Sequence, residues 1–356
     1  MNKTALYKQI HMDIKEKILS GELRPKDRVP SEQEIMDEYK VSKITVKNAL
    51  TTLADEGLVV RIQGKGTFVS PDPFIPEDRR RQEAAFKSDS NCIGFIIPTM
   101  KTRVIQQLVE HVEYYLQERG LHMILRLTRE SSGEESRAIR ELTEAKVRGL
   151  IVFPTEDEKY NESLLRLSLD KFPFVFIDRY LRNIETYTIT SDNFGGAYET
   201  TSYLLNKGHR QIALISPENA NTAIEDRTAG FEKAYIDQGI SIDKNLWCHV
   251  PLHILRGRNA LSYIIEFLQA HPHITAAFAL TAEMTNLTHQ ALQSIRKQAG
   301  ELELISFDDP EIAHIPYVMQ DEKAMAQTAV QLLLRQMESE YAPQQAVIPV
   351  KLVLLE

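Results

Sequence analysis

A cluster of hydrogen-bond donors opens a helical segment within the first fifth of the chain. The residues are Ser42, Lys43, Thr45, Lys47 and Asn48. In a helix-turn-helix, the N-terminal residues of the second helix of the motif meet the base edges of duplex DNA. Hydroxyl, ammonium and amide groups of this reach suit bases and phosphates. The competing interpretation is a solvent-facing helix surface, which is the ordinary explanation of a single lysine.

Three predicted helices and a hairpin would position these donors. Residues 4–19 carry leucine or isoleucine at every fourth position, which indicates one apolar stripe of a helix. Ser31 followed by Glu34 forms the capping box that opens a second helix. A short turn then leads to a third helix over residues 42–55, and a glycine-containing hairpin follows over residues 58–69. This order of elements predicts a winged helix-turn-helix.

The rest of the chain has a different pattern. Residues 71–91 contain three prolines and an arginine triplet, which favours a linker. After it, apolar strands alternate with helices, and the alternation restarts after residue 190. The predicted strands are 92–97, 123–127, 149–153, 174–177, 211–215, 247–250, 276–280 and 303–307. Such a pattern predicts an α/β fold of parallel sheets covered on both faces, here in two doubly wound lobes with a cleft between them.

We therefore expect three parts. A winged helix-turn-helix occupies residues 1–70, a linker residues 71–91, and a two-lobed, periplasmic-binding-protein-like domain residues 92–356. Lobe 1 is expected over about 92–188 and 320–345, and lobe 2 over about 189–319 and 346–356. The chain would cross between the lobes near residues 188–191, 318–321 and 346–349.

Charge is unevenly divided between these parts. The net charge is −8 overall, yet residues 1–70 carry 12 Lys and Arg against 10 Asp and Glu. The remaining residues carry 30 against 40. The acidic remainder of the chain, here called the body, repels DNA. Any DNA contact should therefore be confined to residues 1–70, here called the head.

Several function classes find no support in the sequence. Cys92 and Cys248 lie far apart, so we expect reduced, buried thiols. The histidines from 249 to 289 are irregularly spaced, and glycine-rich phosphate loops and nucleophile elbows are absent. We expect no metal site, no cofactor and no catalysis. The polar N-terminus and the lack of a long apolar run predict a cytoplasmic protein without a membrane segment.

Two stretches resemble known families. Residues 5–70 are similar to the head of the GntR family, and residues 92–356 resemble the effector domain of the LacI/GalR family. The first resemblance rests on the blocks at 28–32, 41–50, 53–58 and 63–69. The second rests on the blocks at 93–98, 149–154, 176–179, 191–197, 207–213, 226–231 and 305–309.

The head resemblance implies contacts with double-stranded operator DNA. Arg28, Ser31 and Thr45 suit phosphates, and Glu32 suits either cytosine or a neighbouring cation. The wing tip would approach the minor groove through Gln63, Gly64, Lys65 and Gly66. The family usually has arginine where this chain has Lys43 and Lys47. Lysine lacks the planar fork that arginine offers to guanine, which implies a changed operator or weaker specific binding.

The body resemblance implies a sugar site. Asp178, Arg227 and Asp308 match positions that line it, and a guanidinium can hold two adjacent oxygens. The alternatives for these residues are a buried structural ion pair or a helix cap. Many LacI-type proteins carry Asn-Asp before the position of Met284, whereas this chain has Thr281-Ala282. Some of the polar work could pass to Thr281 or Glu283.

The combined resemblance implies a ligand-responsive transcription regulator. We expect a homodimeric repressor of carbohydrate-utilisation genes that a sugar releases from its operator. An activator, or a regulator that needs its small molecule as a corepressor, stays open. A transport binding protein would need a signal peptide and no DNA-binding head, and an enzyme would need a catalytic cluster.

Overall fold

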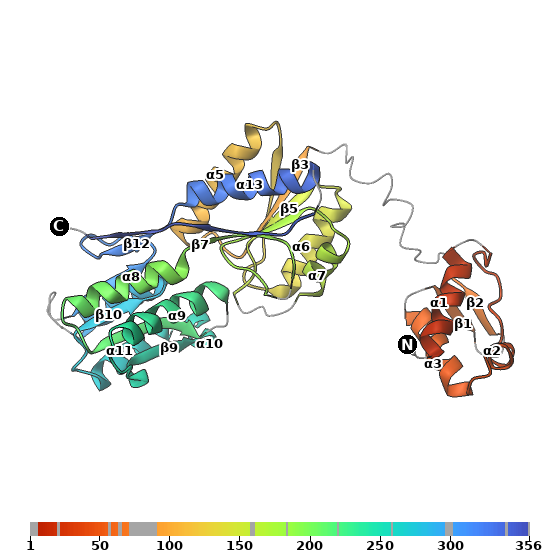
Figure 1. The fold of residues 1–356 in the computed structure, drawn as a ribbon, viewed down its shortest axis with the longest axis horizontal. Coiled ribbons are helices and arrows are strands. Elements are labelled where there is room, and N and C mark those ends of the chain that lie inside the picture. The colour runs from red at the N-terminus through yellow and green to blue at the C-terminus, as the bar shows by residue number, and fades with distance from the viewer. Residues whose placement is uncertain are drawn as a thin grey trace. The chain divides into compact units, whose positions relative to one another are not determined.

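A computed structural model gives the architecture of the chain. It describes residues 6–19, 22–55, 58–62, 66–70, 91–156, 161–182, 184–218, 221–257, 259–295, 302–338 and 341–354. The chain divides into two compact units, Met1–Ala85 and Phe86–Glu356 (Figure 1). The predicted linker lies almost wholly outside the described residues.

The first unit contains the predicted three helices and hairpin (Figure 1). They are α1 (Leu6–Leu19), α2 (Glu32–Tyr39), α3 (Lys43–Asp55), β1 (Val59–Ile62) and β2 (Gly66–Val69). Isoleucines of α1 pack against Val46, Leu50 and Leu53 of α3 in one core, because a spacing of three or four residues puts them on one helix face. The two strands pair antiparallel and close this core from one side.

The second unit contains two α/β lobes (Figure 1). The first has a six-stranded parallel sheet in the order β13-β7-β6-β5-β3-β4. Its strands are β3 (Cys92–Ile97), β4 (His122–Leu127), β5 (Gly149–Val152), β6 (Phe174–Ile177), β7 (Tyr187–Ser191) and β13 (Gln345–Ile348). Helices α5 (Arg103–Gln117) and α13 (Glu322–Glu338) cover one face, and α6 (Ser132–Glu144) and α7 (Glu162–Leu169) cover the other.

The second lobe repeats this plan. Its six strands run in the order β14-β12-β11-β10-β8-β9, and all pairs are parallel except β12 with β14. Its strands are β8 (Ile212–Glu218), β9 (Trp247–Pro251), β10 (Ala276–Ala279), β11 (Glu303–Phe307), β12 (Tyr317–Met319) and β14 (Lys351–Val353). Its helices are α8 (Asn193–Asn206), α9 (Thr222–Asp237), α10 (Leu252–Arg256), α11 (Ala260–Ala270) and α12 (Ala282–Ser294), with a 3-10 turn at Lys244–Leu246. The predicted two-lobed α/β fold is therefore confirmed.

Three chain crossings join the lobes. They lie between β7 and α8, between β12 and α13, and between β13 and β14. We expected lobe 1 to end at 188 and 345, but β7 and β13 pair within the first sheet as far as Ser191 and Ile348. Both strand ends lie within the crossings expected near residues 188–191 and 346–349.

Two further expectations need comment. Cys248 is buried, and burial raises the pKa of its thiol to about 12. Cys92, expected to be buried, is half-buried at the start of β3. Among the described residues, no helix has the length and apolar character needed to span a membrane.

Candidate ligand cleft and DNA-binding surface

Two aspartates occupy equivalent places at the strand ends of the two lobes. Asp178 follows β6, and Asp308 follows β11, the corresponding strand of lobe 2. Both have left-handed backbone conformations, with φ of 68° and 74°. Their backbone N–H groups donate to Ile189 O at 2.8 Å and to Val318 O at 3.1 Å. Aspartate tolerates this conformation better than most residues do. Each of the two residues places a carboxylate at the carboxyl-terminal edge of its sheet.

Arg227 on α9 is the most tightly held cation at this place. It is 3% exposed, its Nε donates to Asn193 Oδ1 at 2.8 Å, and its Nη1 donates to Leu280 O at 2.6 Å. Nη1 lies 3.6 Å from Asp308 Oδ2, and the guanidinium carbon lies 3.6 Å from the centroid of the Phe307 ring. Burial lowers the pKa of Arg227, and the carboxylates of Asp308 and Asp178 oppose that shift.

Close helix packing helps to hold this arginine in place. Gly230 lies one turn after Arg227, and a Cβ there would lie 2.3 Å from Phe194 O on α8. Glycine therefore lets α9 approach α8, the helix that carries Asn193.

Asp178 has a looser partner. Its Oδ2 lies 3.8 Å from Arg179 Nε, and burial raises the pKa of Asp178 against the charges of Arg179 and Arg227. Arg179 also lies 3.8 Å from Glu130 Oε1 and 5.0 Å from the centre of the Phe153 ring. These groups belong to loops that follow the strands of lobe 1.

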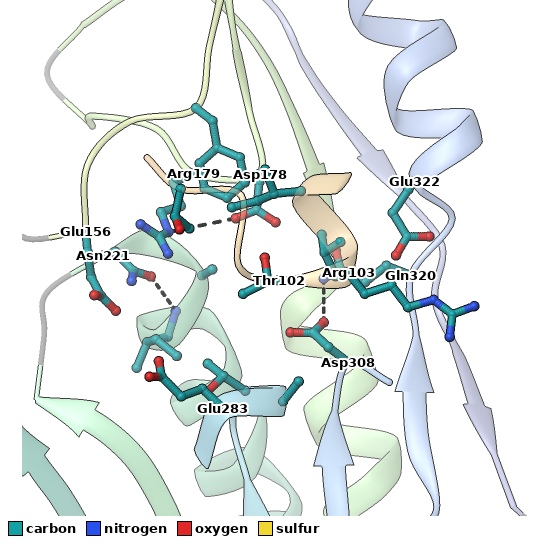
Figure 2. A pocket seen from close by; sticks show the side chains of 18 of the residues that line it. Thr102, Arg103, Glu156, Asp178, Arg179, Asn221, Glu283, Asp308, Gln320 and Glu322 are labelled. Carbon is teal, nitrogen blue, oxygen red and sulfur yellow. Dashed lines mark hydrogen bonds and ion pairs between the residues drawn. The ribbon is translucent and has the colours of Figure 1, made fainter. Parts of the chain in front are cut away.

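These side chains face a cleft of about 240 Å³ between the lobes (Figure 2). Residues of both lobes line it, and most of them are polar or charged. The polar and charged lining residues include Thr102, Arg103, Glu130, Glu156, Asp178, Arg179, Asn221, Arg227, Thr281, Glu283, Asp308, Asp309, Gln320 and Glu322.

The structure brings all four residues expected at a ligand site to this cleft. Asp178 and Arg227 line it, together with Thr281 and Asp308. Thr281 also caps α12, because its hydroxyl accepts from Met284 N at 3.2 Å. The alternative of a buried ion pair thus describes a real contact between Arg227 and Asp308.

Other lining residues were missed by the sequence reasoning. Glu283 was named as a substitute donor or acceptor, but Arg103, Glu156 and Arg179 were not. Arg179 could have been found, because it follows a strand end directly, where ligands of doubly wound sheets bind. Arg103 lies on α5, on the opposite lobe from its partner Asp309, which Nη1 reaches at 2.7 Å. No local pattern indicates such a pairing.

A buried amide connects the cleft to the lobe crossings. Gln320 is 4% exposed and donates from Nε2 to Asp308 Oδ1 at 2.5 Å. Its Oε1 accepts a hydrogen bond from Ser191 Oγ. Ser191 ends β7 at the first crossing, and Gln320 follows β12 at the second. Asp308 is therefore linked through Gln320 to residues at both crossings.

In the head, the predicted hydroxyl residues also serve as helix caps. Ser31 Oγ accepts from Glu34 N at 3.2 Å, and Glu34 Oε2 accepts from Ser31 N at 2.6 Å. The predicted capping box is therefore confirmed. Ser42 Oγ accepts from Thr45 N at 3.3 Å and lies 2.9 Å from Thr45 Oγ1. These N-termini present N–H groups of the kind that bind phosphates.

Charged residues of the head lie on α3, on α2 and next to the two strands. Lys43 and Lys47 are exposed on α3. Glu32 Oε1 lies 3.1 Å from Arg61 Nη2 on β1, so it orients a cation, one of its two expected roles. Arg61 was not among the predicted residues. Arg28 lies against Gly66, whose φ is 116°. The predicted wing-tip residues 63, 64 and 65 lie outside the described residues.

A winged helix-turn-helix and a two-lobed domain with a polar cleft are the parts of a ligand-responsive DNA-binding transcription regulator. Residues 90–307 match the family described as periplasmic binding proteins and sugar binding domain of LacI family, and the chain belongs to that family. Residues 6–69 match the bacterial regulatory proteins of the gntR family. Both resemblances expected from the sequence are confirmed, and the matched families comprise regulatory and binding proteins rather than enzymes.

Two curated relatives match most of the chain. An arabinose metabolism transcriptional repressor of Halalkalibacterium halodurans is 31% identical over 71% of this chain and 66% of its own length. A protein with the same name from Geobacillus stearothermophilus is 26% identical over 85% of this chain and 82% of its own length. The chain thus spans just under two thirds of the first relative and about four fifths of the second.

Solved structures show the same body. A structure from Burkholderia thailandensis has a TM-score of 0.67 at 25% identity and covers 75% of this chain and 100% of its own. A LacI family transcriptional regulator from Enterococcus faecium with bound ribose has a TM-score of 0.62 at 22% identity, over 74% of this chain and 96% of its own. At that identity the second likeness concerns the fold alone.

Proposed function

We propose that this protein is a cytoplasmic repressor of carbohydrate-utilisation genes that a small sugar releases from its operator. The observation that carries the proposal is the convergence of Arg227, Asp178 and Asp308 on one cleft between two hinged lobes. The proposal is supported by the names of the two curated relatives, both repressors of arabinose metabolism. We therefore take arabinose as the first candidate ligand.

The chemistry of the cleft suits a sugar. A guanidinium donates to two neighbouring oxygens, and carboxylates accept from hydroxyl groups. Arg227 and Asp308 offer both kinds of group within 3.6 Å of each other. A volume of about 240 Å³ lies just below the usual range for drug-sized ligands, about 300–1,000 Å³, and so favours a monosaccharide.

Ligand would act by closing the lobes. Arg103 already bridges to Asp309, and Arg182 Nη2 of lobe 1 lies 2.8 Å from Glu225 Oε2 of α9. A sugar that contacts Asp178 and Asp308 together favours the closed arrangement, because it binds both lobes at once. In a homodimer, such a change would alter the spacing of two heads that read half-sites about 34–36 Å apart.

The direct test is release of DNA. The full-length chain would select an operator duplex from a random pool, and fluorescence anisotropy would then follow binding with and without arabinose and other pentoses and hexoses. We expect one sugar to weaken DNA binding at least about tenfold, a typical allosteric coupling. Operator affinity that no sugar changes would contradict the proposal, and a sugar that tightens binding would make it a corepressor.

The DNA surface is tested by Lys47→Ala. Lys47 is exposed on α3, so its loss should leave the head folded while removing one phosphate or base contact. We expect weaker operator binding and a salt dependence whose slope falls by about 1. Anisotropy titrations across a salt series measure both. Lys351→Ala, an exposed lysine on β14 of the body, is the matched control. Equal salt slopes for both variants would place Lys47 away from DNA.

A further inference from the structure

Every arginine among the described residues that line the cleft is already paired with a carboxylate of the protein. Arg227 lies 3.6 Å from Asp308, and Arg103 lies 2.7 Å from Asp309. Arg179 lies 3.8 Å from both Asp178 and Glu130. An incoming anion would therefore have to share or break one of these pairs.

Carboxylates outnumber these arginines. Seven acidic side chains line the cleft against three arginines, and no lysine or histidine is among the described lining residues. The acidic residues are Glu130, Glu156, Asp178, Glu283, Asp308, Asp309 and Glu322. Even without Glu322, whose pKa burial raises to about 7, six carboxylates remain against three arginines, so the lining is negative.

The surplus charge lies on both sides of the cleft. Figure 2 shows Glu156 and Glu283 on the side of Asn221, with Glu322 on the far side beyond Gln320. Burial raises the pKa of Glu283, and the charges of Glu156 and Glu130 raise it further. Glu283 is therefore harder to ionise in the cleft than in water.

At the helix N-termini, the other common anion sites, some N–H groups already donate to side chains of the protein. Asn221 caps α9 by accepting from Ile224 N at 2.9 Å, and Thr281 caps α12. Asp321 Oδ1 accepts from Ala324 N at 2.8 Å in the first turn of α13. At the N-terminus of α5, Thr102 makes no side-chain cap, but the first residue of the helix, Arg103, already pairs with Asp309.

We propose that this cleft selects an uncharged sugar and rejects the phosphorylated or carboxylate form of the same sugar. The inference rests on the proposed function and concerns the ligand class of that site. A phosphate monoester brings a charge of about −1.5 to −2 at neutral pH. Breaking a buried pair to receive it leaves a carboxylate uncompensated. Hydroxyl groups add no charge, and they can donate to carboxylates and accept from arginines that stay paired.

The test uses matched ligands on the full-length chain. Isothermal titration calorimetry would compare aldopentoses and aldohexoses with their terminal phosphates and with their aldonic or uronic acids. We expect a neutral sugar to bind, and its anionic partners to bind at least about tenfold more weakly. An anionic member that binds as tightly as its neutral partner, or more tightly, overturns the inference but leaves the proposed function intact. If no carbohydrate of either kind binds, the proposed function itself fails.

A charge variant tests the cause. In Glu156→Gln/Glu283→Gln, the ratio of the dissociation constants for the phosphorylated and neutral sugars should fall by at least about threefold, because two negative charges are removed. Glu144→Gln, an exposed carboxylate at the end of α6, is the matched control and should leave the ratio unchanged. A ratio unchanged in the double variant, with circular dichroism showing a folded protein, would assign the selectivity to contacts other than charge and overturn the argument.

Discussion

At the scale of single residues, the site depends on a carboxylate beside a buried guanidinium. Asp308 accepts from Gln320 at 2.5 Å and lies 3.6 Å from Arg227. A buried ion pair of this kind contributes little net stability, since desolvation offsets attraction. Its use is to fix two groups of opposite hydrogen-bonding character in one orientation.

Asp308→Asn should therefore damage ligand binding more than folding. The amide keeps the shape of the side chain but loses the charge and one acceptor. We expect sugar affinity to fall at least about tenfold, since bonds to charged groups contribute about 1.5–3 kcal/mol. Calorimetry with the sugar identified above measures the loss. Asp237→Asn, at the exposed end of α9, serves as the control. Comparable affinities for the two variants would remove Asp308 from the site.

Glu322 makes stability depend on pH. Burial, together with the charges of Asp308 and Asp321, raises the pKa of Glu322 to about 7, against the opposing charge of Arg103. Between the unfolded pKa near 4.5 and about 7, the folded chain binds a proton that the unfolded chain does not. This group's contribution to stability is therefore present at low pH and is lost as pH rises through 7.

Glu322→Gln should remove that dependence. Relative to the unchanged chain, the variant should gain stability at pH 8 compared with pH 5.5. Urea unfolding at both pH values measures the difference, with Glu144→Gln as the control. A relative stability that is the same at both pH values would show that Glu322 titrates normally.

Ser31 precedes a helix and Asp308 ends an apolar strand, so each leaves a local signal in the sequence, whereas Asp178 and Arg227 were expected from the family resemblance alone. Arg103 and Gln320 left none, because their roles depend on Asp309 and Asp308, which are far from them in sequence. Pairing between lobes is a property of tertiary structure.

At the scale of elements, long periodic segments were predictable and short strands were not. The stripe of α1 and the apolar runs of β3 and β6 carry strong periodicity or continuous burial. Strands β12 and β14 have three residues each, and their pairing is fixed by neighbours in the sheet. Sequence periodicity needs more residues than these strands have.

The cap of α2 gives an element-scale prediction. Ser31→Ala removes the acceptor for Glu34 N and should destabilise the helix by about 1 kcal/mol. Amide hydrogen exchange of the full chain should then be faster in peptides covering α2. Thr51→Ala, at an exposed position within α3, is the control, because alanine favours helix interiors. Unchanged exchange in α2 would mean that other contacts hold the helix.

At the scale of the whole molecule, the chain contains two units with different charges and tasks. Basic residues slightly outnumber acidic ones in the head, 12 against 10, whereas the body carries the acidic cleft and the three crossings. The link from Arg227 through Asp308 and Gln320 to Ser191 gives ligand binding a route to the hinge. Ligand binding in the cleft and operator binding by the head are therefore expected to be coupled.

Sugar binding measured with and without operator DNA tests this coupling. Calorimetry would give the dissociation constant of the releasing sugar for the free chain and for the chain saturated with its operator. Because coupling free energy is shared by both ligands, operator DNA should weaken sugar binding by the same factor by which the sugar weakens operator binding. Identical sugar affinity with and without operator would contradict the account.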